Sequence, residues 1–174
     1  MLRVLLDGVG ARPLSNALVP GLAAAGRAPV QVSAQDFLRP AGERYEWGRE
    51  DAEAFRTTWL DAAALDREVL SREDGYLPAL WDADADRSAR RAVEPVPPGA
   101  VLLVDGVLLL GRGLPAEVTV HLAVSPAALL RRGVPPWQLP AFDAYDRQVR
   151  PGHACDVLIR AEDPLRPVLR VRGG

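Results

Sequence analysis

The sequence contains no lysine, and all 21 of its basic residues are arginine. A reaction that depends on a lysine ammonium is therefore excluded unless another cation takes its place. Arginine is an imperfect replacement, because its planar guanidinium is larger and approaches an anion from a different position. The bias is typical of a GC-rich coding sequence, but the chemical consequence does not depend on its origin.

Cysteine and histidine are almost as scarce. The single cysteine, Cys155, cannot form a disulfide within the chain, which fits a reducing compartment. We interpret it as a small core residue rather than a nucleophile. The two histidines, His121 and His153, lie far apart in the sequence, so they do not predict a metal cluster.

Long apolar runs and an excess of positive charge are also missing. No apolar run approaches the roughly 18 residues of a membrane span, and no signal peptide is visible. The net charge of −2 argues against a nucleic-acid-binding surface. We therefore expect a soluble, cytoplasmic protein without a membrane or nucleic-acid partner. Its 174 residues are the length of a single domain, 1–174.

Short apolar runs do alternate with helical patterns along the chain. The runs predict buried strands at residues 2–6, 29–33, 100–104, 118–124 and 156–160. The intervening patterns predict helices at 14–25, with a kink at Pro20, at 50–72, with a break near 57–61, at 126–132, and from 140 to 150. Residues 75–91 read as irregular, and a tail follows from Pro164. This order favours an α/β domain with a mostly parallel sheet flanked by helices.

The turn after the first strand carries an incomplete phosphate-binding signature. The full pattern has Gly, four residues, then Gly-Lys-Ser/Thr. In a gapless match Gly8 and Ser15 are in register, but Pro13 replaces the second glycine and Leu14 replaces the lysine. The loop thus loses one backbone N–H and the cation on the β/γ phosphates. Arg12 is the nearest substitute cation.

Two carboxylates follow strands at the edge where parallel sheets bind ligands. Asp36 comes just after the strand at 29–33, and Asp105 directly follows the run at 100–104. A surface or helix-capping role explains Asp36 about as well as a site role. For Asp105 a site role is favoured, because a carboxylate at the end of an apolar strand needs a polar partner.

Taken together, these segments resemble the uridine kinase-like branch of the P-loop kinases. The matching segments are the turn at 7–9, residues 32–37, the stretch from Tyr76 to Arg87, and the strand at 101–106. The resemblance implies a three-layer P-loop NTPase-like fold that uses ATP and Mg²⁺ to phosphorylate a hydroxyl of a nucleoside-like small molecule. Residues 133–136 interrupt the stretch where that family has a continuous lid helix.

The resemblance also implies a role for each matching residue. Catalytic roles would fall to Asp36, Asp105 and Arg131, and cofactor binding to Gly8, Gly10, Arg12, Ser15 and Arg132. The metal would be held by Ser15 and Asp105, and the substrate by Tyr45, Tyr76, Trp81, Asp82 and Arg87. The alternative for the substrate-side residues is plain: a tryptophan is often a packing residue, and an Asp-rich loop is often only solvated.

Three functions remain open from the sequence. The chain could be a phosphotransferase that uses Arg12 or a lid arginine as its cation. It could be a non-catalytic module that kept the substrate side, or a scaffold for another reaction of Asp36 and Asp105 without ATP. Association of copies through residues 133–140 would be compatible with each. The position of Leu14 separates the first two, because a leucine packed inward would leave no phosphate cradle.

Overall fold

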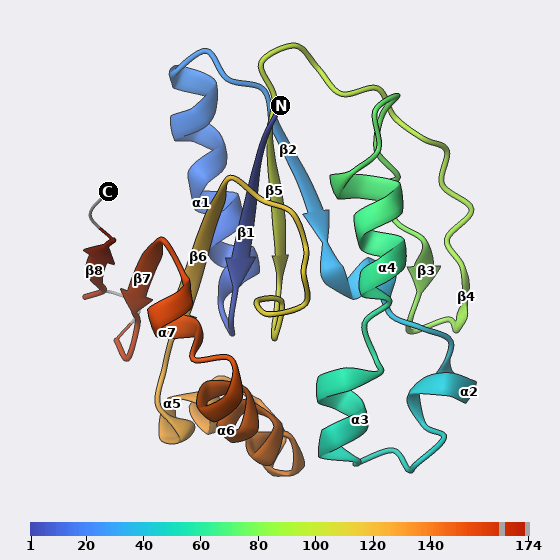
Figure 1. Ribbon diagram of the computed structural model, residues 1–174, viewed down its shortest axis with the longest axis vertical. Helices are drawn as coiled ribbons and strands as arrows, with labels where there is room; N and C mark the ends of the chain where they lie inside the picture. The colour runs from blue at the N-terminus through green and yellow to red at the C-terminus, as the bar shows by residue number, and fades with distance from the viewer. Residues whose placement is uncertain (164–165, 173–174) are drawn as a thin grey trace.

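The computed structural model describes residues 1–163 and 166–172, so the start of the expected tail at Pro164 lies outside the described residues. A six-stranded sheet forms the centre of the protein, in the order β2-β5-β1-β6-β7-β8 (Figure 1). Its strands are β1 (Leu2–Asp7), β2 (Pro29–Ser33), β5 (Val101–Gly106), β6 (Val118–Ala123), β7 (Val157–Arg160) and β8 (Val168–Val171). All pairs are parallel except β7 with β8. The predicted α/β class with a mostly parallel sheet is confirmed.

Helices cover both faces and the carboxyl end of this sheet. The long helix α1 (Ala11–Ala24) lies on one face, and α4 (Ala62–Leu65) lies on the other (Figure 1). Below the carboxyl ends of the strands lie α3 (Ala52–Thr57), α5 (Pro126–Arg131) and α6 (Leu139–Gln148). The two remaining short helices of the described residues are α2 (Ala41–Arg44) and α7 (Pro151–Ala154). Among the described residues, no helix is both long and apolar enough to cross a membrane.

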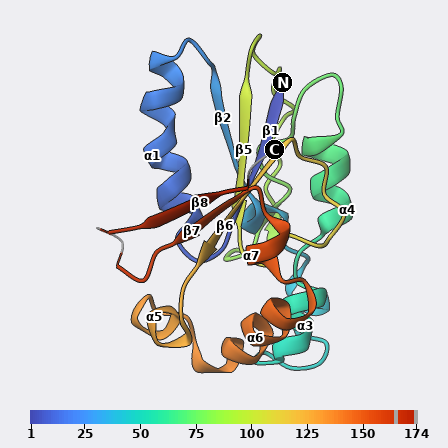
Figure 2. The same ribbon diagram turned by 60° about the vertical axis from the view of Figure 1, so that its left-hand side comes forward.

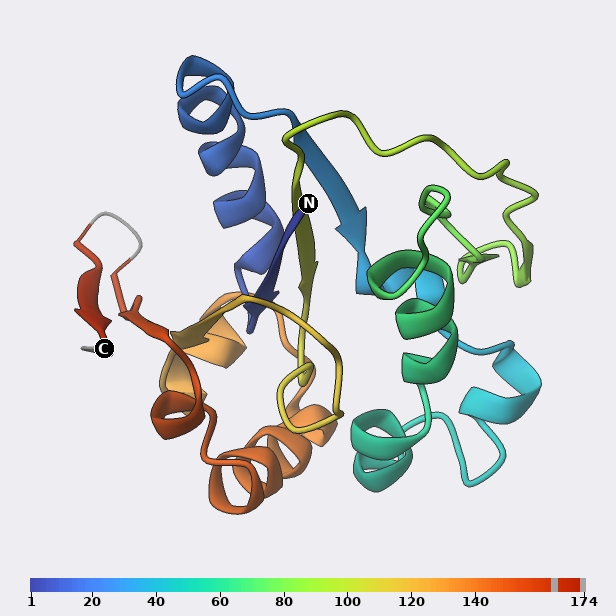
Figure 3. The ribbon, with the colours of Figure 1, turned by 45° about the horizontal axis from the view of Figure 1, so that its top comes forward.

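Short irregular turns connect these elements. They are the 3₁₀ turns η1 (Ala34–Phe37) and η3 (Pro136–Gln138) and the π turn η2 (Asp66–Leu70). A small hairpin of β3 (Trp81–Asp82) and β4 (Arg87–Ser88) stands apart from the main sheet. The segment between β4 and β5 returns from this hairpin to the amino end of β5 (Figure 3).

The core consists of two apolar clusters, one on each face of the sheet. Successive residues of β5 alternate between them, as the two-residue period of a strand requires. Leu102 and Val104 join the cluster beneath α4, while Val101 and Leu103 join the cluster beneath α1. Leu14 of α1 packs against this second cluster.

Three local features differ from the sequence-based expectations. Helix α1 begins at Ala11 rather than at residue 14, because Gly10 in a left-handed conformation starts it. Pro20, where a kink was predicted, is exposed and lies within α1, and the helix continues past it to Ala24. Strand β8 was not predicted; its Val168, Leu169 and Val171 are exposed, and it forms the edge of the sheet beside β7 (Figure 2). The break expected near 57–61 is confirmed between α3 and α4, with Asp61 capping the second helix.

Candidate functional site

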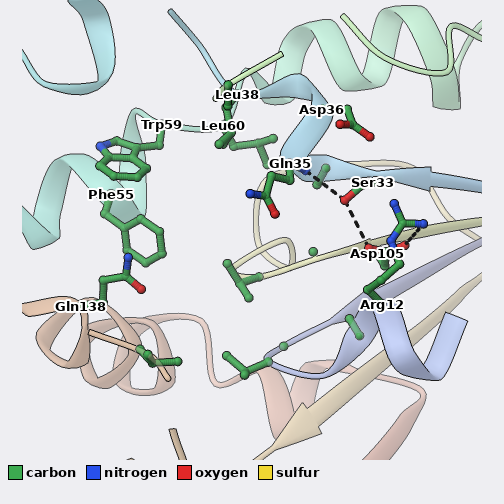
Figure 4. Close-up of a pocket in the computed structure, with 18 of the residues that line it drawn as sticks. Arg12, Ser33, Gln35, Asp36, Leu38, Phe55, Trp59, Leu60, Asp105 and Gln138 are labelled. Atoms are coloured by element: carbon green, nitrogen blue, oxygen red, sulfur yellow. Dashed lines mark hydrogen bonds and ion pairs between the residues drawn. The ribbon is translucent and has the colours of Figure 1, made fainter. Parts of the chain in front are cut away.

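A cavity of about 890 Å³ opens at the carboxyl end of the sheet. One end of it is polar and contains Arg12, Ser33, Asp36 and Asp105 (Figure 4). The other end is aromatic, with Phe55, Trp59 and Phe142 in its wall. The strand register produces the polar end, because Ser33 of β2 pairs with Asp105 of β5 where both strands finish. The cavity therefore lies where parallel α/β sheets bind their ligands.

Asp105 is the most buried charged group of the polar end. Its Oδ1 accepts a hydrogen bond from the Ser33 hydroxyl at 3.3 Å, and its Oδ2 lies 3.3 Å from a guanidinium nitrogen of Arg12. The Arg12 contact is an ion pair without hydrogen-bond geometry, so within the described chain Oδ2 has no hydrogen-bond partner. Burial raises the pKa of Asp105, although Arg12 and Ser33 oppose the rise. Asp105 thus lines the cavity with a buried acceptor oxygen that lies against the Arg12 guanidinium.

Asp36 lies on the same polar side, half-buried in η1. Burial raises its pKa, the Arg12 guanidinium opposes this, and the Asp82 carboxylate adds to it. Asp36 also contributes to the rise of the Asp105 pKa. The two carboxyl groups therefore interact electrostatically, and the positive charge of Arg12 stabilises the ionised form of both.

The burial of Asp105 has a measurable consequence for stability. A carboxyl whose folded-state pKa is raised destabilises the fold as pH rises from the unfolded-state pKa through the folded-state one. We therefore expect Asp105→Asn to have a higher Tm than the wild type at pH 7, with the gap closing toward pH ~4, near the ordinary carboxyl pKa. Asp84→Asn, at an exposed carboxylate of the same cavity, is the control and should leave Tm unchanged. A lower Tm for Asp105→Asn at pH 7 would show that its bonds to Arg12 and Ser33 outweigh its desolvation.

The glycine turn after β1 lines the cavity, but it is closed on itself by backbone hydrogen bonds. Gly8 has a φ of 117°, and a Cβ there would come within 2.6 Å of the Leu122 carbonyl oxygen, so only glycine fits. Its N–H donates to the Gly106 carbonyl at 2.8 Å, and the Ala11 N–H donates back to the Gly8 carbonyl at 3.1 Å. The N–H groups of Gly8 and Ala11 therefore donate to the backbone and are not free to donate to a phosphate. Helix α1 starts at once, and Leu14 turns inward onto the sheet.

The residues present do not fit a triphosphate with its magnesium ion in the way the P-loop signature requires. Ser15 is fully buried within α1, outside the cavity lining, and its hydroxyl accepts a hydrogen bond from Gln31 at 2.7 Å. Pro13 has no N–H to offer, and Leu14 provides no charge. Arg12 is the remaining cation of this stretch, and it lies against Asp105.

The two arginines of the interrupted lid point to different places. Arg132 lines the cavity and donates to the Val9 carbonyl at 2.9 Å and to the Ala161 carbonyl, so it ties the end of α5 to the glycine turn. A Cβ on Gly10 would lie 3.4 Å from this guanidinium. Arg131 is outside the cavity lining, exposed, and 3.9 Å from Glu162.

Of the predicted substrate-side residues, some line the cavity and others lie outside it. Trp81 and Asp82 line the cavity, whereas Tyr45, Tyr76 and Arg87 do not. The Tyr45 ring packs edge-on against Trp59, behind the aromatic wall. Tyr76 donates to Glu94 at 2.8 Å, and burial together with that carboxylate raises the pKa of Tyr76 to about 12. Arg87 is exposed on the hairpin.

Several residues of the site were not found from the sequence. The aromatic wall was missed because Phe55, Trp59 and Phe142 come from distant segments that meet only in the fold. Behind the glycine turn, Asp7 accepts hydrogen bonds from the Tyr145 hydroxyl at 2.8 Å and contacts His121 Nδ1 at 2.7 Å. An aspartate directly after the apolar residues Val4–Leu6 was the available signal.

Comparison with known proteins supports the fold but not a family assignment. No family model and no curated protein sequence matches the chain. A solved structure described as a possible uridine kinase from Bacillus stearothermophilus matches with a TM-score of 0.74 and 19% identity, over 90% of this chain and 87% of that one. The YGR205w protein matches with a TM-score of 0.54 and 10% identity, over 99% and 90%. The predicted P-loop NTPase-like fold is thus confirmed, and at these identities the likeness shows the fold alone.

Proposed function

We propose that this protein binds a nucleoside-like small molecule in the cavity at the carboxyl end of the sheet and does not transfer phosphate from ATP. One observation carries the proposal: the glycine turn that lines the 890 Å³ cavity is closed on itself by backbone hydrogen bonds, and Leu14 packs against the apolar cluster beneath α1 where the signature has a cation. The likeness to a possible uridine kinase makes a nucleoside-like ligand the first to test.

The two ends of the cavity suit a ligand that is polar at one end and flat at the other. Hydroxyl groups can donate to the carboxylate of Asp36, and to Oδ2 of Asp105 when the Arg12 guanidinium moves aside. Because Oδ2 has no hydrogen-bond partner within the described residues, a ligand hydroxyl that reaches it adds a hydrogen bond that the free protein lacks. An unsaturated ring can lie against Phe55 and Phe142 at the opposite end.

A nucleoside panel tests this directly. At one hundred times its Kd, a ligand adds roughly 2.7 kcal/mol to the stability of the folded state, which raises Tm by several degrees. We expect such a rise with at least one nucleoside, without ATP and without Mg²⁺. Millimolar Mg-ATP alone should give no shift and no release of ADP. If no nucleoside shifts Tm, the proposed ligand class is wrong.

The rival function is phosphotransfer with Arg12 in place of the missing lysine. One observation favours it: the Arg12 guanidinium lies in the cavity between the two carboxylates that the kinase chemistry would use. This rival predicts ADP release that depends on a nucleoside and is lost in both Arg12→Ala and Asp36→Asn. Such a result would replace the proposed binding function with catalysis.

A further inference from the structure

Two carboxamide side chains line the cavity near its aromatic end. Gln35 extends from η1, which follows β2, and Gln138 extends from the last residue of η3 (Figure 4). In the close-up, the Gln138 amide lies beside the Phe55 ring, and Gln35 projects into the cavity from the opposite wall. The two amides thus reach the same hollow from segments that are about a hundred residues apart.

Neither amide is used by the protein itself. Within residues 1–163 and 166–172, the side chains of Gln35 and Gln138 have no hydrogen-bond partner, whereas the Gln31 amide donates to Ser15 at 2.7 Å and to Asn16 at 2.9 Å. Their backbones are nevertheless held, because the Gln138 N–H donates to the Pro135 carbonyl at 3.0 Å and the Gln35 N–H to the Ser33 hydroxyl at 3.4 Å. The structure therefore fixes where both side chains start and leaves their polar atoms for a ligand.

The aromatic wall beside them is rigid. Phe55 meets Trp59 edge to face, with ring centroids 5.2 Å apart and an interplanar angle of 89°, and it contacts Trp137 and Phe142 at 5.7 and 6.1 Å. Such interlocked rings give up little freedom when a ligand arrives. These side chains would exclude water from one face of a flat ring of the ligand. The polar edge of that ligand ring would then be recognised by other groups.

The indole N–H of Trp81 and one carboxylate oxygen of Asp82 are already occupied by bonds within the hairpin. Trp81 donates its indole N–H to Asp86 at 3.2 Å, and Asp82 Oδ1 accepts from the backbone N–H groups of Asp84 and Ala85. These bonds hold the hairpin together. Recognition of a ring edge consequently falls to the two glutamines rather than to the Trp81–Asp82 pair that the sequence suggested.

We propose that Gln35 and Gln138 determine specificity by reading the hydrogen-bonding edge of a planar heterocycle held against Phe55. A carboxamide offers an N–H donor and a C=O acceptor side by side, which matches the N–H and C=O of a lactam edge or the corresponding amidine. The ligand class is therefore a neutral flat ring with such an edge, as in a nucleoside base. This inference rests on the proposed function, in which the hydroxyl groups of the same ligand face Asp105.

The test compares ligands that differ only at that edge. Uridine and inosine are titrated into the wild-type protein beside 3-methyluridine and 1-methylinosine, in which a methyl group replaces the hydrogen of the edge N–H. We expect N-methylation to weaken binding about tenfold or more, since the glutamine carbonyl then has no donor to accept from. In Gln35→Leu and Gln138→Leu this discrimination should fall several-fold. Gln148→Leu, at an exposed glutamine outside the cavity, is the matched control.

The outcomes separate this inference from the function on which it rests. If neither parent nucleoside binds the wild type, the proposed function fails for these ligands. If a nucleoside binds but the wild type does not distinguish it from its N-methylated form, the edge-reading role is wrong while the binding function stands. A ratio of affinities that is unchanged in both leucine variants overturns the inference as well. A wild-type protein that does not discriminate overturns the inference even if both variants fail to fold, and a single folded leucine variant suffices to test the assignment to its glutamine.

Discussion

Replacing Asp7 with alanine is expected to remove about 3–5 kcal/mol from the free energy of unfolding, because three buried groups lose their partner and each unsatisfied group costs roughly 1–3 kcal/mol. Asp7 is fully buried, and its two oxygens serve three groups. Oδ1 accepts from the Leu109 N–H at 2.9 Å, and Oδ2 contacts the Tyr145 hydroxyl at 2.8 Å and His121 Nδ1 at 2.7 Å. Truncation leaves all three without this partner in an interior that admits little water.

Urea unfolding at pH 7, followed by tryptophan fluorescence, measures this loss. Tyr145→Phe removes one of the three contacts and should cost less, roughly 1–2 kcal/mol. Asp143→Ala is the surface control: it breaks an exposed ion pair with Arg147 on the same helix and should change stability by no more than about 0.5 kcal/mol. A cost for Asp7→Ala as small as that of the control would mean that the contacts of Asp7 do not stabilise the fold.

The Asp7 contacts also connect the fold to the candidate site. Asp7 immediately precedes the Gly8 turn, and Tyr145 lies on α6, which carries Phe142 into the aromatic wall. His121 belongs to β6, the neighbour of β1 in the sheet, with Asp7 and His121 in register. One buried carboxylate therefore joins the turn, a strand and the helix that together border the cavity.

The sheet could be predicted from the sequence because its parallel strands are short and mostly apolar. Residues 100–104 form an unbroken apolar run, and β5 does have a strand on each side, β2 and β1. The edge strand β8 gave no such signal, since its apolar residues alternate with arginines and remain exposed. The start of α1 at Ala11 was also not predictable from the sequence. It is determined by the left-handed Gly10 and by the backbone bonds of Gly8, and not by the tendency of Pro13 to start a helix.

The polar end of the site was predictable for a related reason. In a parallel sheet every strand ends at the same edge, so Asp36 and Asp105 were expected there together before any coordinates were known. The aromatic wall and the two glutamines were not predictable, because their proximity depends on how α3, η3 and α6 pack below the sheet. The Asp7–His121 pair depends on the strand order, which sequence patterns do not give.

Leu14→Lys restores the residue that the P-loop signature requires, and it is expected to fail as a rescue. Residue 14 lies one turn into α1, and its side chain faces the apolar cluster beneath that helix. An ammonium group at this position would therefore start out directed at the apolar cluster rather than at a phosphate. The variant should lose about 1–3 kcal/mol of stability, as for a half-buried leucine replaced by a charged side chain that can partly reach water. Millimolar Mg-ATP should still give no thermal shift.

The double variant Pro13→Gly/Leu14→Lys makes the test more stringent, because it supplies both missing residues of the signature at once. Leu18→Lys is the matched control: Leu18 lies one turn further along α1 and is 37% exposed, so its cost should be below about 1 kcal/mol. If the double variant gains saturable stabilisation by Mg-ATP, the loop can reopen, and its closed form is then a consequence of Pro13 and Leu14 alone. If it gains none, the bonds of Gly8 to Gly106 and to Ala11 keep the turn closed whatever side chains follow it.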